Sequence, residues 1–154
     1  MIIEKATLQD AESILAIQKE AYIREAITYN NYEIAPLTET LEEMKDDFKQ
    51  KTVLKAILNE KVVGSVKGYV EKGTCYVERL MVDPASQGQG IGKKLMLDLE
   101  TYFPDCERFE LYTGGKSTYN IRFYEKLGYT IFKTEMIREN IDFVFMEKQN
   151  SQNN

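Results

Sequence analysis

Short apolar runs separated by polar turns occupy the middle of the chain and predict three consecutive strands. Residues 53–58 and 62–70 are rich in valine and other β-favouring residues, and the polar residues 59–61 separate them. Residues 71–73, which end in glycine, separate the second run from a third run at 75–82. Tight polar turns between such runs are typical of hairpins. The pattern therefore predicts an antiparallel meander.

Apolar residues at intervals of three and four predict helices on both sides of this meander. Thr7 and Thr40 each stand three positions before an acidic residue, which is the capping-box pattern of a helix start. Gly128 stands where a glycine commonly ends a helix. The predicted helices cover residues 7–22, 40–48, 91–102 and 117–127. The tyrosine-rich stretch 29–38 between the first two is expected to be a loop.

The remaining apolar runs predict four further strands. They cover residues 2–6, 109–113, 129–138 and 141–147, and the last two form a hairpin that turns at Glu139-Asn140. A strand, a helix and a second strand in succession favour a parallel pair with a right-handed connection. We therefore expect a mixed α/β fold in one domain of residues 1–148, with a polar tail at 149–154 that frays.

Composition limits the possible reactions and ligands of the protein more than it limits its possible folds. The 154 residues suffice for one domain with a real core. The net charge of −5 gives no indication of nucleic-acid binding or of an anionic membrane partner, and it is compatible with a cationic substrate. Histidine is absent, which excludes Ser-His-Asp and Cys-His catalysis and removes the commonest metal ligand. No metal site is expected.

The two cysteines, Cys75 and Cys106, do not form a C-x-x-C motif. We interpret them as buried thiols rather than as a disulfide or a metal pair. The chain shows no signal-peptide pattern and no apolar run long enough to span a bilayer. We therefore expect a cytoplasmic protein without a membrane partner.

A glycine-rich turn directly follows the third strand of the meander and precedes a helix. Asp83-Pro84 ends the strand, and Gln87-Gly88-Gln89-Gly90-Ile91-Gly92 leads into helical spacing at Ile91, Leu95 and Leu99. Glycines expose backbone N–H groups, and a helix N-terminus favours anions, so this turn predicts a phosphate site. The alternative is a glycine turn without a ligand.

Two common phosphate loops do not match this turn. A Walker loop needs Gly-Lys-Ser/Thr, whereas Gly92-Lys93 is followed by Lys94. A dinucleotide fingerprint, G-x-G-x-x-G, would start at Gly88 and places Lys93 at its last glycine. The pattern that fits is Gln/Arg-x-x-Gly-x-Gly/Ala, with Gln87, Gly90 and Gly92 at its three defined positions.

This loop, together with Phe123-Tyr124-Glu125-Lys126-Leu127-Gly128-Tyr129, resembles the Gcn5-related N-acetyltransferase (GNAT) family. The second segment is similar to the F-Y-x-K-x-G-F/Y stretch that closes the family's core. The resemblance implies a mixed sheet of six or seven strands with about four helices. It also implies that the fourth and fifth strands splay apart and that acetyl-CoA, as co-substrate, occupies the opening.

The resemblance also assigns roles to individual residues. Tyr124 would be the general acid for the departing thiolate, or alternatively an aromatic that packs against CoA. Glu78 would be the general base, or alternatively a salt-bridged carboxylate, and strand alternation puts it on one face with Tyr76 unless a bulge intervenes. The expected acetyl-CoA contacts are Leu80, Met81 and Val82 for the pantetheine arm, and Gln87, Gly88, Gln89, Gly90, Ile91, Gly92 and Lys93 for the pyrophosphate.

Two further sets of residues are less constrained by the motifs. Many family members carry asparagine seven positions before the catalytic tyrosine, where this chain has Ser117. Ser117 or the nearby Asn120 would contact CoA, and Ser117 is alternatively a plain helix cap. Tyr32 and Glu33, in the loop 29–38, are the candidates for binding a cationic substrate, with packing beneath the loop as the alternative for the tyrosine.

These features predict an acetyl-CoA-dependent N-acetyltransferase that acts on a primary amine by direct attack in a ternary complex. The acceptor is either a small molecule or a protein amine, because specificity lies in variable loops. The alternative is a catalytically silent acyl-CoA-binding sensor, which would keep the glycine loop without needing Tyr124. A homodimer is an analogy with the family that no residue pattern in the chain supports.

Overall fold

Seven strands form one mixed sheet in the computed structural model, which describes residues 1–138 and 141–153. The strand order is β1-β2-β3-β4-β5-β7-β6. The predicted meander is confirmed as antiparallel β2-β3-β4, and β4 and β5 are the predicted parallel pair. The strands are β1 (Ile2–Lys5), β2 (Thr52–Leu58), β3 (Lys61–Glu71), β4 (Thr74–Val82), β5 (Arg108–Gly114), β6 (Thr130–Arg138) and β7 (Ile141–Gln149).

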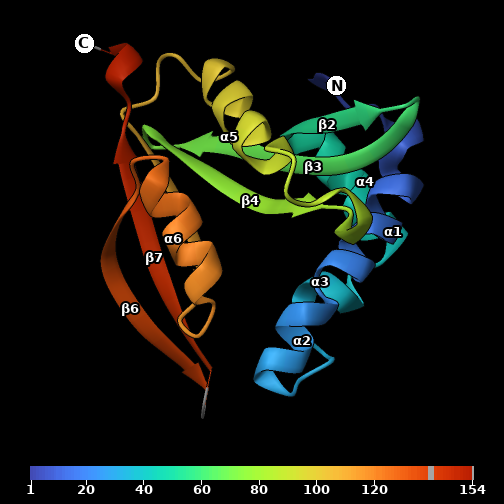
Figure 1. Ribbon diagram of the computed structural model, residues 1–154. Helices are drawn as coiled ribbons and strands as arrows, with labels where there is room; N and C mark the ends of the chain where they lie inside the picture. Colours follow the sequence, from blue (N-terminus) through green and yellow to red (C-terminus); the bar gives the residue numbers. More distant parts are fainter. Residues whose placement is uncertain (139–140, 154) are drawn as a thin grey trace.

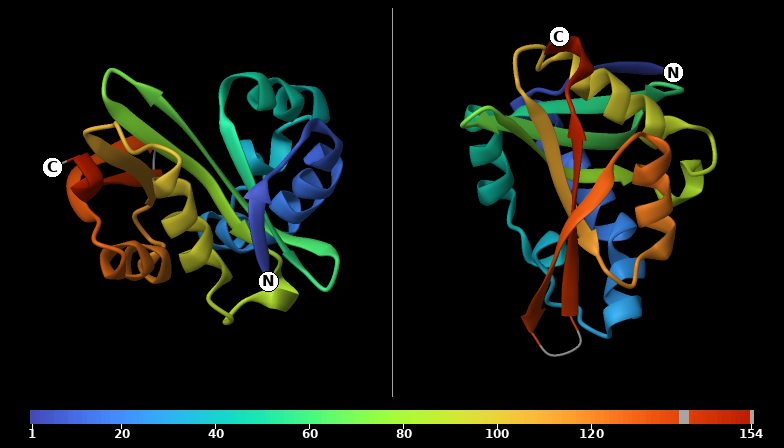
Figure 2. Two further views of the ribbon diagram at one scale, coloured as in Figure 1. Left: turned by 90° about the horizontal axis from the view of Figure 1, so that it is seen from above. Right: turned by 90° about the vertical axis from the view of Figure 1, so that its left-hand side faces the viewer.

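Helices cover both faces of the sheet (Figure 1; Figure 2). Two of them, α5 and α6, lie on one face, and α1 and α4 lie on the other. The expected mixed α/β architecture is thus confirmed, with seven strands. The helices are α1 (Ala11–Ala21), α2 (Ile23–Tyr29), α3 (Ala35–Thr38), α4 (Leu41–Gln50), α5 (Ile91–Thr101) and α6 (Thr118–Lys126).

Capping residues set the starts of the helices on the second face. The Thr40 hydroxyl accepts the Glu43 N–H at 3.2 Å, and the Glu43 carboxylate accepts the Thr40 N–H at 3.0 Å. This reciprocal pair satisfies two donors that a helix start leaves free, and it is worth about 1 kcal/mol. The equivalent pattern at Thr7 opens a short 3-10 turn, Leu8–Asp10, which leads directly into α1.

Each face of the sheet has its own core. Beneath α5, Leu95 and Leu99 are fully buried against Leu54, Val66 and Phe109 of the sheet. Full burial of one such side chain contributes roughly 1.5–3 kcal/mol. The smaller core beneath α1 and α4 consists of Ala11, Ile14, Ile17, Met44, Val53 and Met81. Both faces of the sheet are therefore packed against helices. The end at which β4 and β5 separate is available for a ligand site.

The segment before α4 differs from the expected single helix and loop. The first helix ends at Ala21 and a second, α2, continues from Ile23 to Tyr29, where Asn30 adopts a left-handed φ of 48°. The expected loop contains the short helix α3, with Pro36 near its start, where a missing N–H costs nothing. Neither short helix carries enough apolar periodicity to be recognised from sequence.

The C-terminal end also differs from the expected frayed tail. Strand β7 runs to Gln149, and Asn150 is only 5% exposed. The Asn150 amide donates to the carbonyls of Phe103, Pro104 and Cys106, at 3.2, 3.2 and 2.8 Å. A polar side chain that satisfies three loop carbonyls is buried without penalty. The predicted turn at Glu139-Asn140 lies outside the described residues.

Candidate active site

The two middle strands of the sheet separate and open a cavity between them. Strands β4 and β5 pair over only three positions, from Thr74↔Arg108 to Tyr76↔Glu110. Beyond Tyr76 they diverge, as the family resemblance implied. A cavity of about 550 Å³ lies at the opening, with walls from α2 and α3 on one side and α6 on the other (Figure 1). This volume suits a small-molecule site.

A bulge in β4 shapes the floor of the cavity. The register with β3 shifts between Ser65↔Met81 and Lys67↔Glu78, so Arg79 and Leu80 together face one residue of β3. Arg79 has a φ of 54°, in the left-handed region that side chains rarely adopt. A bulge releases backbone groups from the ladder and re-aims side chains. The register from Tyr76 to Glu78 is regular, so these two side chains keep the same face of the strand, and the bulge affects only the residues after Glu78.

The glycine loop forms the end of the cavity next to α5. Gly88 and Gly90 have φ values of 81° and 78°, so both positions favour glycine. A Cβ built on either would meet no protein atom within 4 Å, which shows open space beside the loop. Gly90 is the N-cap of α5, an 11-residue helix whose N-terminus favours an anion. Of the expected loop residues, the cavity is lined by Gln87, Gly88, Gly90, Ile91, Gly92 and Lys93, but not by Gln89.

Tyr124 faces the same cavity from α6. Its ring packs edge-on against Phe123 and Tyr129, with centroid distances of 5.2 and 6.0 Å. Burial raises the pKa of its hydroxyl far above the ordinary value, so the group keeps its proton at neutral pH. A protonated hydroxyl held by aromatic packing can donate to a leaving group in the cavity.

Glu78 lines the cavity on β4 but is already ion-paired. Its carboxylate accepts from the Lys51 ammonium at 2.5 Å, and Lys51 also lies 3.3 Å from Asp47. Glu78 is therefore a salt-bridged carboxylate, which was the alternative interpretation, and it also lines the cavity, as the interpretation as a base requires.

Ser117 and Asn120 are held together by a residue that sequence reasoning missed. The Ser117 hydroxyl donates to Glu25 Oε1 at 2.7 Å, and the Asn120 amide donates to the same oxygen at 3.2 Å. Ser117 occupies the N-cap position of α6 without making a side-chain cap. The plain-cap interpretation is therefore wrong. Asn120 lines the cavity, whereas Ser117 does not.

Tyr22 is the second functional candidate that the motifs did not indicate. Its hydroxyl donates to the carbonyl of Leu80, in the β4 bulge, at 3.3 Å. Burial raises the pKa of this hydroxyl to about 12, although the charge of Arg79 opposes the change. Tyr22, Glu25 and Tyr29 follow one another at intervals of three and four, so one helical face was a signal that could have grouped them.

The two substrate candidates of the loop 29–38 are separated by the structure. Glu33 lines the cavity and its N–H donates to Asn31 Oδ1 at 2.9 Å. Tyr32 is 57% exposed and does not contribute to the lining. Tyr112 and Phe143 are among the aromatic residues that do line the cavity, and their ring centroids lie 4.8 Å apart.

A model of the acetyltransferase (GNAT) family matches residues 12–129 of the chain. The chain belongs to the GNAT family. The match extends from α1 through the glycine loop to Tyr129 of the second motif, so it includes most of the cavity lining. A comparison with curated proteins finds no match.

Solved structures of GNAT proteins share the fold. PaiA N-acetyltransferase from Thermoplasma acidophilum, in complex with coenzyme A, is 18% identical with a TM-score of 0.82, over 97% of this chain and 99% of that one. The ribosomal-protein-S18-alanine N-acetyltransferase from Escherichia coli is 16% identical with a TM-score of 0.80, over 97% and 94%. Aminoglycoside 6'-acetyltransferase type Ii is 19% identical with a TM-score of 0.75, over 97% of each chain.

The described residues of this GNAT protein suit coenzyme A better than they suit a metal. A positive-φ glycine loop with open space beside it, at a helix N-terminus, is the donor set that a pyrophosphate needs. Within residues 1–138 and 141–153, no group of three or more potential metal-ligating side chains occurs. No helix in these segments has the length and apolarity that a membrane crossing needs.

Proposed function

We propose that this protein is an acetyl-CoA-dependent N-acetyltransferase that acts on a primary amine by direct attack in a ternary complex. The observation that supports the proposal most is one cavity that joins three parts. They are the glycine loop at Gly90, the β4 bulge at Leu80 and the Tyr124 hydroxyl. Acetyl transfer from a thioester requires a site for the phosphates of the co-substrate and a proton donor for the departing sulfur in one cavity.

The co-substrate would lie along the β4 bulge and the glycine loop. Amides of the loop from Gln87 to Lys93 would bind the pyrophosphate, and backbone groups of Leu80, Met81 and Val82 would bind the pantetheine arm. Leu80 is in the bulge, Met81 and Val82 follow it, and all three line the cavity. Asn120 also reaches the cavity and would contact CoA, while its bond to Glu25 holds its amide in place.

The acceptor must lose a proton for the reaction to proceed. An alkylammonium has a pKa of about 10.4, so little neutral amine exists at neutral pH without a base. Glu78, directly or through a water, would take this proton. The amine nitrogen then forms a bond to the thioester carbonyl carbon as the C–S bond breaks, and Tyr124 gives its proton to the departing sulfur.

The cysteines support direct transfer rather than a covalent enzyme intermediate. Cys75 and Cys106 are both buried, and neither lines the cavity. Burial raises the pKa of Cys75 to about 12, which leaves almost none of the thiolate that a nucleophile requires. The buried-thiol interpretation made from the sequence is confirmed.

The test is thiol release from acetyl-CoA against a panel of amino acids, diamines, aminoglycosides and peptide N-termini. Tyr124→Phe should lower turnover by roughly 10²–10⁴ with acetyl-CoA affinity retained. Tyr102→Phe, at an exposed tyrosine outside the cavity, is the matched control. Tight acetyl-CoA binding without thiol release across the panel would favour the silent acyl-CoA sensor. Equal turnover of wild type and Tyr124→Phe at every pH would refute the acid role.

A further inference from the structure

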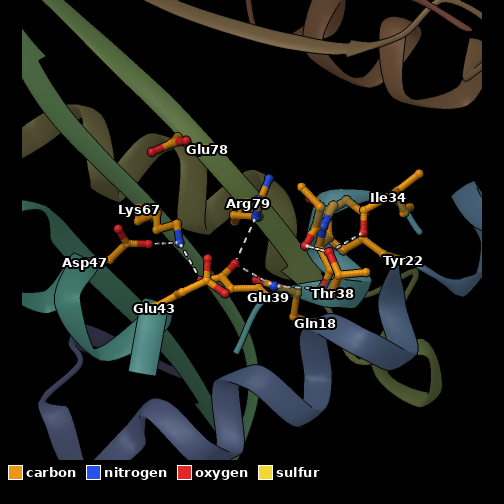
Figure 3. A network of polar contacts seen from close by, with 12 residues as sticks. Gln18, Tyr22, Ile34, Thr38, Glu39, Glu43, Asp47, Lys67, Glu78 and Arg79 are labelled. Atoms are coloured by element: carbon orange, nitrogen blue, oxygen red, sulfur yellow. Dashed lines mark hydrogen bonds and ion pairs between the residues drawn. The ribbon is translucent and has the colours of Figure 1, made fainter. Parts of the chain in front are cut away.

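Arg79 is a cavity residue that the proposed reaction does not use. It is the left-handed residue of the β4 bulge, between Glu78 and Leu80. Glu78 and Arg79 both extend from β4 beside the network of polar side chains near α1 and α4 (Figure 3). The Arg79 side chain is 18% exposed and lines the cavity. A left-handed backbone at an arginine in the cavity lining is a costly arrangement that needs a reason.

The guanidinium of Arg79 is poorly satisfied by the protein. Its Nε lies 3.5 Å from Glu39 Oε1, and this contact is its one close ion pair among the described residues. Within those residues the buried Nε has no hydrogen-bond acceptor. A guanidinium offers five N–H donors in a planar fork, and buried donors are normally satisfied. The terminal nitrogens Nη1 and Nη2 make no hydrogen bond to the described residues, so their donors are available to a ligand in the cavity.

Glu39 cannot satisfy the whole guanidinium of Arg79, because its carboxylate also contacts other groups. Its Oε1 also accepts the Gln18 amide at 3.0 Å, and its Oε2 lies 3.9 Å from the Lys67 ammonium (Figure 3). The carboxylate thus anchors the Nε side of Arg79 and leaves the other side of the fork to the cavity. Planar, bidentate recognition of a carboxylate is the interaction for which arginine is best suited.

The charges that line the cavity do not match a polycation. Three carboxylates and three cations contribute to the lining, namely Glu25, Glu33, Glu78, Arg24, Arg79 and Lys93. An acceptor that carries both an amine and a carboxylate suits this balance. The amine would lie toward Glu78, next to Arg79 in the chain.

We propose that the acceptor is an amino acid whose carboxylate binds the fork of Arg79 while its amine faces Glu78. This inference rests on the proposed N-acetyltransferase function. The rest of the acceptor would lie against the ring pair of Tyr112 and Phe143, so an apolar or aromatic side chain is favoured. Arg79 is then a specificity-determining residue, and Glu39 is a positioning residue that holds it.

The test compares ligands that differ only in the carboxylate. N-acetyl-L-phenylalanine and its amide are titrated into the CoA-saturated protein by calorimetry, a measurement that needs no turnover. Wild type should bind the acid about 10–100-fold more tightly than the amide, as expected for a charge-assisted bidentate bond. Arg79→Met should remove this preference, and Arg79→Lys should restore only part of it because an ammonium lacks the fork.

Two controls separate the role of Arg79 in recognition from a structural role. Arg122→Met removes an exposed arginine of α6 outside the cavity and should keep the wild-type preference. CoA affinity should be equal in wild type and in Arg79→Met, which shows that the cavity has kept its shape. The matched kinetic comparison is L-phenylalanine against phenethylamine, for which Arg79→Met should raise KM for the acid much more than it lowers kcat.

Several results would overturn the inference. They are no binding of the acid, equal binding of acid and amide, a preference that survives in Arg79→Met, or faster acetylation of 1,5-diaminopentane than of any amino acid. Failure of the proposed function has a different signature. In that case thiol release is absent with every acceptor, while the preference for the carboxylate in the binding experiment still decides the role of Arg79.

Discussion

The two ends of the cavity differ in how their residues are distributed along the sequence. The end next to α5 comes from residues 80–82 and from the glycine loop, which lie in one short stretch of chain. The opposite end consists of side chains from the end of α1, from α2, from the segment that leads into α3 and from β4, which are far apart in the sequence. Cavity residues that are contiguous in the sequence can be recognised as a motif, whereas cavity residues that are far apart in the sequence cannot.

The two ends also differ in how they carry charge. The glycine loop offers partial charges of amides at a helix start. Beside the other end, three cations and three carboxylates form a chain of ion pairs, part of which Figure 3 shows. A change in the loop should therefore affect ligand binding, whereas a change in the ion network should affect folding. The members of the network are Lys51, Lys67, Arg79, Glu39, Asp47 and Glu78.

Removing Lys67 should have the largest effect on stability. Its side chain is 7% exposed and its ammonium lies 2.5 Å from Asp47. Lys67→Met takes one cation from Asp47 and Glu39, although Asp47 keeps Lys51 and Glu39 keeps Arg79. Breaking a buried pair costs up to about 3–5 kcal/mol. Urea unfolding should show this loss, with CoA affinity of the folded fraction retained. Lys49→Met, at a 75% exposed ion pair, should cost less than about 0.5 kcal/mol. A loss below about 1 kcal/mol for Lys67→Met would contradict the buried-network interpretation.

Substituting Gly90 should have the largest effect on ligand binding. Its φ of 78° disfavours a β-branched residue, and a side chain would enter the space beside the loop. Gly90→Val should weaken CoA binding at least about 100-fold, or roughly 2.7 kcal/mol, by calorimetry. Gly73→Val places the same strain at a φ of 82°, away from the cavity. Unchanged CoA affinity in Gly90→Val would refute the loop assignment.

The sequence predicted these two ends unequally, for a physical reason. Gly90 and Tyr124 belong to motifs whose residues are adjacent, so the family resemblance could assign expected roles to them. The meander followed from the turn pattern, and the strand splay followed from the resemblance. Tyr22, Glu25 and Arg79 reach the cavity only because a helix breaks after Ala21 and because β4 bulges. Such events depend on tertiary packing, which no local pattern encodes.

Glu78 belongs to both the ion network and the proposed reaction, so its substitution tests which of these two roles affects turnover. Glu78→Gln should lower turnover roughly tenfold near neutral pH, with recovery as the pH approaches the pKa of the amine itself. Glu110→Gln breaks a similar ion pair, 2.9 Å from Arg108, outside the cavity, and should leave the pH–rate profile unchanged. A Glu78→Gln profile that coincides with wild type would reduce this residue to its salt bridge.

Acid sensitivity should be the smallest effect of the ion network. Burial opposes ionisation of Asp47, but Lys67 and Lys51 outweigh it and hold the pKa of this carboxyl below its ordinary value. Because its pKa is lower in the folded than in the unfolded chain, Asp47 stabilises the fold above the ordinary value. This contribution is lost as the pH falls through the folded value. Solvent screening should keep it below about 1 kcal/mol.

Urea unfolding at a series of pH values from neutral to about 3 measures this contribution of Asp47. Asp47→Asn should give a shallower loss of stability in the acid range than wild type, because the titrating carboxyl is gone. Asp46→Asn is the matched control, since Asp46 lies on the same helix, is 71% exposed and should keep the wild-type slope. Equal slopes for all three proteins would show that the ion pairs with Lys67 and Lys51 leave the proton affinity of Asp47 unaltered. The end of the cavity opposite α5 would then be stabilised by packing rather than by charge.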